Sequence, residues 1–118
     1  MLHHMKLQSA PLKKIRCGQK TIEVRLNDPK RRLISVGDVV EFSENDYPDH
    51  QVLTRVQALL YYPTFVDLYT SHDPTLFGGE SREFLLNQIR QFYSPADEEK
   101  YGVVGIRIQL IDENDESL

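Results

Sequence analysis

The stretch Gly18-Gln19-Lys20-Thr21-Ile22-Glu23-Val24-Arg25 decides how the rest of this 118-residue chain is interpreted. From Thr21 onward, polar and apolar residues alternate with the two-residue period of a β-strand. The alternation separates two faces, one with Ile22, Val24 and Leu26 and the other with Thr21, Glu23 and Arg25. Gly18 precedes the alternation and suits the positive φ of a helix end or a turn. We therefore predict a helix that ends at Gly18 and a strand that begins at Thr21.

Three charged side chains in this stretch lie within reach of one another. Lys20 stands at the start of the predicted strand, and Glu23 and Arg25 share one face, with about 7 Å between their Cα atoms. By the local pattern alone, Glu23 and Arg25 form an ion pair on an exposed strand, worth about 0 to 1 kcal/mol. From the local pattern alone, the Glu23–Arg25 ion pair can therefore be either purely structural or part of a functional site.

Resemblance to a family adds to this interpretation. The pattern Gly18-x-Lys20-x-x-Glu23-x-Arg25 resembles the signature of the ASCH domain, a small β-barrel with a PUA-like fold. Two later segments resemble the second barrel strand and the closing strand of that family: Val36–Phe42 and Tyr101–Ile108. The resemblance extends from Met5 to Ile111. It predicts an α+β fold, a small PUA-like mixed β-barrel of about five or six strands with short inserted helices.

The remaining pattern fits such a barrel. Further strands are predicted near residues 5–7, 39–42, 52–62 and 102–111 from their apolar or alternating composition. Helices are predicted after the cap residues Thr64 and Ser81, and a short helical turn after Ser94. The glycine-rich segment 71–79 is predicted to be a loop, and whether it covers a cleft stays open.

Length and composition indicate one domain over residues 1–111 and an acidic C-terminal tail over 112–118, which we expect to be disordered. The net charge is −4, yet residues 13–32 hold eight basic and two acidic side chains, so this segment carries +6 and the remainder −10. Such a distribution steers anionic ligands toward one face. We expect no membrane partner, because no segment has the length and apolarity of a membrane span.

A single cysteine, Cys17, excludes an internal disulfide and fits a cytoplasmic location. Its place in the last turn of the predicted helix favours a half-buried structural thiol. The histidines have no metal-ligand spacing, and no cofactor motif is found, so we expect neither metal nor cofactor. The oligomeric state stays open.

The resemblance implies a cleft beside the predicted strand that binds RNA or a nucleotide or nucleoside. By position in the family motif, Lys20, Glu23 and Arg25 are assigned to that cleft. Lysine and arginine suit phosphate, and glutamate accepts hydrogen bonds from a base or ribose. Further predicted ligand-binding residues are Thr21, Arg31, Arg32 and Tyr61. An outer phosphate-attracting rim is predicted from Lys13, Lys14, Lys30, Arg31 and Arg32.

Two alternatives stay open beside RNA or nucleotide binding. The first is a hydrolase at the same cleft, with Lys20 and Glu23 as catalytic residues. It is either a ribonuclease or an amidohydrolase like the family members that act on N4-acetylcytidine. Those amidohydrolases are described as using a threonine nucleophile three residues after the motif lysine, where this chain has Glu23. The second is a protein-interaction module in which Glu23 and Arg25 are only a structural pair.

Overall fold

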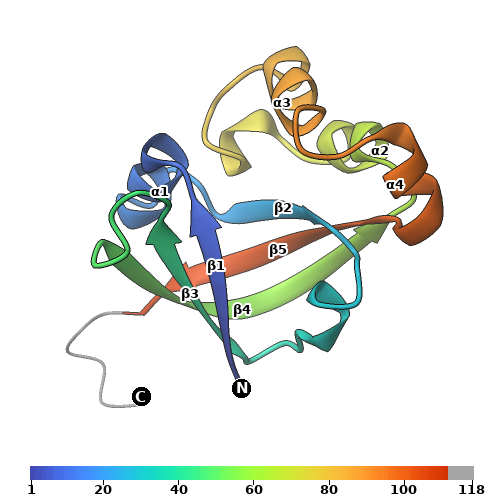
Figure 1. Ribbon diagram of the computed structural model, residues 1–118. Coiled ribbons are helices and arrows are strands. Elements are labelled where there is room, and N and C mark those ends of the chain that lie inside the picture. The colour runs from blue at the N-terminus through green and yellow to red at the C-terminus, as the bar shows by residue number, and fades with distance from the viewer. Residues whose placement is uncertain (112–118) are drawn as a thin grey trace.

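The computed structural model describes residues 1–111, which form one five-stranded sheet with four α-helices and two short 3₁₀ turns (Figure 1). The strands are β1 (Leu2–Leu7), β2 (Ile22–Leu26), β3 (Val39–Glu44), β4 (Gln51–Tyr62) and β5 (Val103–Leu110). The α-helices are α1 (Ser9–Arg16), α2 (Phe65–Thr70), α3 (Arg82–Ile89) and α4 (Pro95–Tyr101). The 3₁₀ turns are η1 (Arg31–Leu33) and η2 (Pro74–Leu76).

The strand order is β1-β3-β4-β5-β2, so β1 and β2 are the two outer strands of the sheet. β1 runs parallel to β3, and all other neighbouring pairs are antiparallel. The long strand β4 pairs with β3 through its first half and with β5 through most of its length, with a register shift between Val56 and Ala58. A bulge of this kind bends a strand and increases its twist. The sheet therefore curves into the mixed half-barrel of a PUA-like, α+β fold, as the sequence predicts.

Two apolar clusters cover the two faces of the sheet. The first fills the inside of the half-barrel and includes Leu12 and Ile15 of α1, which are almost completely buried. The second lies between the outer face of the sheet and the helices α2 and α3. On β2 the apolar residues Ile22, Val24 and Leu26 all belong to this second cluster. The predicted alternation is therefore confirmed, and it directs Glu23 and Arg25 to the opposite side of the strand.

The boundaries near the deciding stretch agree closely with prediction. α1 ends at Arg16, and Gly18 has a φ of 83°, a value that favours glycine. The half-buried position predicted for Cys17 is wrong, because this residue follows the last helical turn and is exposed. No helix within residues 1–111 has the length and apolarity to cross a membrane. The predicted acidic tail lies outside the described residues.

Candidate functional site

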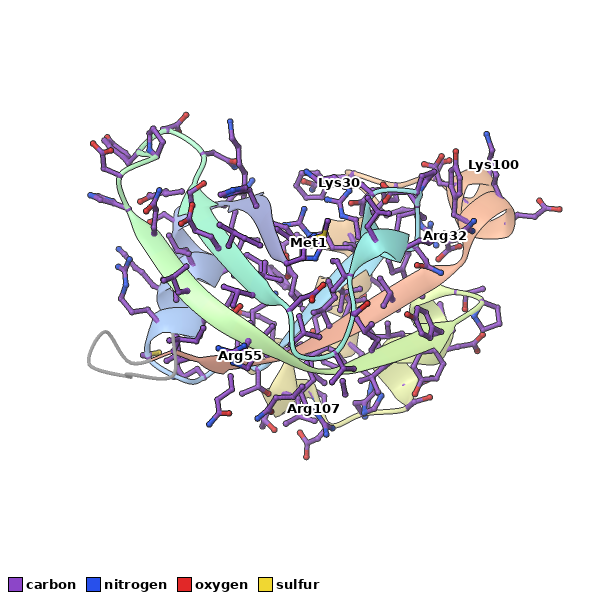
Figure 2. All side chains as sticks on the ribbon, turned by 90° about the horizontal axis from the view of Figure 1, so that it is seen from below. Met1, Lys30, Arg32, Arg55, Lys100 and Arg107 are labelled. Atoms are coloured by element: carbon purple, nitrogen blue, oxygen red, sulfur yellow. The ribbon has the colours of Figure 1, made fainter. Side chains whose placement is uncertain are left out.

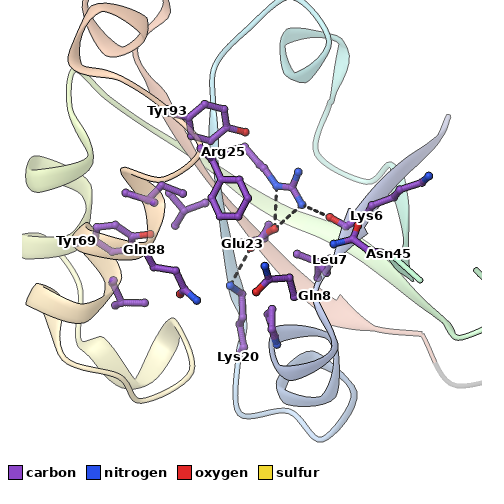
Figure 3. Close-up of a pocket in the computed structure, with 15 residues that line it drawn as sticks. Lys6, Leu7, Gln8, Lys20, Glu23, Arg25, Asn45, Tyr69, Gln88 and Tyr93 are labelled. Atoms are coloured by element: carbon purple, nitrogen blue, oxygen red, sulfur yellow. Dashed lines mark hydrogen bonds and ion pairs between the residues drawn. The ribbon is translucent and has the colours of Figure 1, made fainter. Parts of the chain in front are cut away.

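A cavity of about 220 Å³ lies between the outer strands β1 and β2, and we call it the seam cavity (Figure 3). Residues of β2 and the preceding turn form one part of its lining: Lys20, Glu23, Val24 and Arg25. A second part comes from the β1–α1 connection and the β3–β4 hairpin: Lys6, Leu7, Gln8, Pro11 and Asn45. The third part comes from α2, α3 and the residues after α3: Tyr69, Leu85, Gln88, Ile89, Phe92 and Tyr93. Elements that are far apart in the sequence thus meet around β2, which carries the motif residues Glu23 and Arg25.

Glu23 is the centre of a charged cluster in this cavity. Its Oε1 lies 2.9 Å from Lys20 Nζ, and its Oε2 lies 2.8 Å from Arg25 Nη2 and 2.9 Å from Arg25 Nε. Only 4% of Glu23 is exposed, so the exposed ion pair suggested by the local pattern is wrong. The other parts of the cavity lining cover a strand face that a local pattern alone cannot show to be covered. The structure therefore brings together the three residues of the family motif.

The protonation of Glu23 follows from these contacts. Burial by itself raises the pKa of a carboxyl group, but the charges and hydrogen bonds of Lys20 and Arg25 outweigh burial and lower the pKa of Glu23 to about 2. Burial likewise opposes the charged form of Arg25, but the Glu23 carboxylate raises its pKa above the ordinary value. At neutral pH the cluster holds two cations and one anion, with a net charge of +1.

Arg25 also joins the two sides of the cavity. Its Nη2 donates a hydrogen bond of 2.9 Å to the backbone carbonyl of Lys6 on β1. Tyr69, on the helical side, is buried, and burial together with the Glu23 carboxylate raises the pKa of its hydroxyl above the usual range. The Tyr69 hydroxyl therefore stays protonated and available as a donor at neutral pH.

Lys20 is held in place by backbone contacts on both sides. Its backbone N–H donates to the carbonyl of Lys14 in α1 at 3.0 Å, and Lys20 forms an isolated antiparallel bridge with Phe77. Phe77 is 3% exposed and packs in the second apolar cluster. The predicted loop 71–79 thus contains η2 and supports Lys20 from the side, and the lining residues just named include none from this segment. It does not cover the cavity in this structure.

The other predicted ligand-binding residues lie elsewhere. Thr21 and Lys20 help to line a second, more open depression that also includes Arg107. Arg31 is paired with Asp28 at 3.0 Å. None of Thr21, Arg31, Arg32 and Tyr61 is among the described residues that line the seam cavity.

Arg32 donates to the Asn27 carbonyl at 2.9 Å and lies over the Tyr101 ring, near Lys100 (Figure 2). Tyr61 is 57% exposed on β4. In the predicted rim, Lys14 is paired with Glu80 at 3.1 Å. Three side chains of the predicted rim are therefore used in local contacts, and none of the rim residues, all within the described part of the chain, lines the seam cavity.

The carboxamides Gln8, Asn45 and Gln88 and the aromatic residues Phe92 and Tyr93 line the cavity but were not predicted from the sequence. They lie on elements that are far from the motif in sequence, and no local spacing connects them to it. Within residues 1–111, no group of three or more histidine, cysteine, aspartate or glutamate side chains is placed to hold a metal ion.

Comparisons with known proteins bear on the family and the fold of this chain. The family model of the ASCH domain matches residues 5–112. No curated protein matches the chain. The crystal structure of the hypothetical protein PH0355 is similar, with 33% identity, a TM-score of 0.84, and coverage of 94% of this chain and 100% of that chain.

Two further solved structures are similar. The solution structure of PF0455 from Pyrococcus furiosus has 34% identity and a TM-score of 0.76, covering 95% of this chain and 99% of that chain. ASCH from Zymomonas mobilis has 14% identity and a TM-score of 0.66, covering 96% of this chain and 74% of that chain. This last likeness concerns the fold.

Proposed function

Because this chain belongs to the ASCH domain family, we propose that it binds single-stranded RNA through one nucleotide unit held in the seam cavity. One observation carries the proposal: Lys20, Glu23 and Arg25 form a buried charged cluster inside a cavity rather than an exposed pair. Ion pairs that only stabilise a strand need no adjoining cavity. Charged groups with perturbed pKa values that face a cavity are typical of functional sites.

The free donors of the cluster suit a polar ligand. Lys20 has three N–H groups, and within residues 1–111 the contact with Glu23 occupies one of them. Arg25 uses Nε and Nη2 for Glu23 and Lys6, and its guanidinium also lies beside the Tyr93 hydroxyl. A ligand that offers carbonyl or phosphate oxygens therefore finds pre-oriented cationic donors.

The size of the cavity limits what enters it. A volume of about 220 Å³ is below the roughly 300–1,000 Å³ typical of pockets for drug-sized ligands. The cavity therefore accepts no more than one nucleotide unit, while neighbouring units of a strand remain on the surface. Lys6 is exposed at the rim and provides a positive charge where the strand enters.

The hydrolase alternative requires one of the same residues to act as an effective general base. Glu23 with a pKa of about 2 is a weak base at neutral pH, whereas an efficient general base has a pKa near the working pH. Thr21, the threonine nearest to Lys20 in sequence, does not line the seam cavity. These observations favour binding over general-base hydrolysis by Glu23. The third possibility is a protein-interaction module. Such a module would not explain why the three charged side chains of the cluster line a cavity.

A fluorescence-anisotropy titration with a labelled, mixed-sequence single-stranded RNA tests the proposal. We expect binding that weakens with salt, with a slope of about −0.7 per phosphate neutralised. Lys20→Met and Lys6→Met should weaken binding about tenfold or more, whereas the exposed Lys100→Met on α4 should not. Lys6 is exposed, so its variant folds even if Lys20→Met is unstable. The proposal fails if wild-type protein binds no RNA at low salt, or if Lys6→Met and Lys100→Met behave alike.

The same preparations distinguish binding from hydrolysis. Wild-type protein is incubated with single-stranded RNA and with N4-acetylcytidine, and products are measured by chromatography. Recovery of unchanged RNA and nucleoside supports binding alone. Turnover that is lost in Glu23→Gln but kept in Glu80→Gln would instead assign a hydrolase to the cavity, since Glu80 is not among its lining residues.

A further inference from the structure

Three carboxamide side chains line the seam cavity: Gln8, Asn45 and Gln88. Gln8 and Asn45 are exposed and Gln88 is half-buried, so their donors and acceptors are accessible to a ligand. They come from three separate elements: the start of α1, the β3–β4 hairpin and α3. Figure 3 shows Gln8 and Gln88 on opposite sides of Lys20.

The rest of the lining has a different character. Leu85, Ile89 and Phe92 provide apolar surface on the helical side, and Leu7 and Pro11 provide it on the other side. Phe92 is 60% exposed, so its ring is accessible from solvent beside the cavity. A flat ring with apolar faces and a polar edge matches a cavity that combines apolar surface with accessible carboxamides.

The charge of the cluster bears on which part of a nucleotide is placed inside. Both carboxylate oxygens of Glu23 are engaged by Lys20 and Arg25, so the two cations are already partly neutralised. The cluster keeps a net charge of +1, which is half of what two unpaired cations would present to a phosphate. A neutral base does not depend on this charge, and its carbonyl oxygens accept hydrogen bonds from the remaining N–H groups of Lys20.

We infer that the seam cavity takes the base of a nucleotide, that Phe92 stacks on this base, and that Gln8 and Gln88 read its edge. This inference rests on the proposed function and adds the orientation of the nucleotide and the residues that determine base specificity. A glutamine side chain offers a donor and an acceptor side by side, and so it distinguishes bases by the order of these groups on their edges. The phosphates then remain outside, near Lys6.

The first experiment compares two labelled strands of equal length and charge, a mixed-sequence single-stranded RNA and an abasic ribose-phosphate strand. We expect wild-type protein to bind the abasic strand at least tenfold more weakly, because no base enters the cavity. Phe92→Ala should weaken RNA binding about tenfold, as expected for loss of one stacking contact. Phe84→Ala is the matched control, since Phe84 is 47% exposed on α3 and does not line the cavity.

The second experiment tests specificity with single-stranded oligomers of U, C, A and G. We expect wild-type protein to bind some of the four oligomers more tightly than others. In Gln88→Leu and Gln8→Leu, the ratio of the highest to the lowest affinity should fall several-fold. Gln91→Leu, exposed and outside the lining, should keep the wild-type preference.

The outcomes separate the two proposals. If wild-type protein binds no RNA, the proposed function and this inference both fail. If RNA binds and depends on Lys6, but the abasic strand binds equally well or Phe92→Ala equals Phe84→Ala, only the base-in-cavity inference is overturned. If stacking holds and Gln8→Leu and Gln88→Leu leave base preference unchanged, the assignment of these glutamines is overturned.

Discussion

Nη2 of Arg25, on β2, donates a hydrogen bond of 2.9 Å to the backbone carbonyl of Lys6, on β1. These two strands are the opposite ends of the sheet, so a side chain joins edges that are farthest apart in strand order. The same guanidinium holds Glu23 at 2.8 Å. Arg25 therefore both orients the Glu23 carboxylate of the candidate site and connects the two strands on either side of it.

Replacing Arg25 by methionine should be strongly destabilising. The change leaves Glu23, which is 4% exposed, with Lys20 as its only cationic partner and removes the bond to Lys6. Breaking a buried ion pair from one side costs about 3–5 kcal/mol of unfolding free energy. Urea denaturation measures this loss. Arg55→Met is the control, because half-buried Arg55 makes one backbone bond, to Gly37; equal losses for the two variants would contradict a bridging role.

The low pKa of Glu23 predicts a specific dependence of stability on pH. The folded state lowers this pKa from about 4.5 to about 2. The associated stabilisation is thus fully present above pH 4.5 and is lost as pH falls toward 2. A shift of this size corresponds to on the order of 3 kcal/mol.

The test compares denaturant unfolding of the wild type and Glu23→Gln between pH 2 and 7. Asp38 also has a pKa lowered to about 2, so both proteins should lose stability on acidification. The wild type should lose more, and the excess loss isolates the contribution of Glu23. Parallel curves for the two proteins would mean that Glu23 is not held as a buried carboxylate.

Asp38 is predicted to secure the start of the outer strand β1. Its carboxylate lies 2.8 Å from His3 Nε2 and accepts a bond of 2.9 Å from the Ser35 backbone N–H. These two contacts are the main causes of its lowered pKa. Asp38→Asn should therefore speed amide hydrogen exchange in β1 at pH 7, measured by mass spectrometry. Exposed Asp46→Asn serves as the control, and unchanged exchange in β1 would refute the anchoring role.

Glu98 is predicted to hold α2 and α4 together with the end of α3. It is 7% exposed, accepts a bond of 2.9 Å from the Phe65 backbone N–H, and contacts Arg90 Nη2 at 3.2 Å. Glu98→Ala leaves the buried Phe65 N–H without this acceptor, which costs about 1–3 kcal/mol. Thermal or urea unfolding measures the loss, and Glu98→Gln should restore part of it. If exposed Glu99→Ala costs as much, the assigned contacts carry little energy.

The fold was largely predictable because its signals are local. The alternation from Ile22 to Leu26 places three apolar side chains in one cluster, and this periodicity is visible in the sequence. The turn at Gly18 follows from its need for a positive φ, found at 83°. The family motif also named Lys20, Glu23 and Arg25, and these three side chains do meet in space.

The burial of the motif was not predictable from the same stretch. A strand pattern shows which residues share a face, but whether that face is covered depends on other segments. Here the cover comes from the β1–α1 connection and from α3 with the residues that follow it, parts of the chain up to about 70 residues from the motif strand. The same reason explains why Thr21, Arg31, Arg32 and Tyr61, chosen from residue type and proximity, lie outside the cavity.

The sequence by itself determined the strand periodicity, the turn at Gly18 after the helix and the charged side chains of the family motif, because each depends on residues within a few positions of one another. Only the tertiary structure decided that Glu23 is buried between two cations, that Arg25 spans from β2 to β1, and that Gln8, Gln88 and Phe92 surround them. The physical reason is that desolvation and side-chain contact depend on distance in space, and curvature of the sheet brings its two outer strands together.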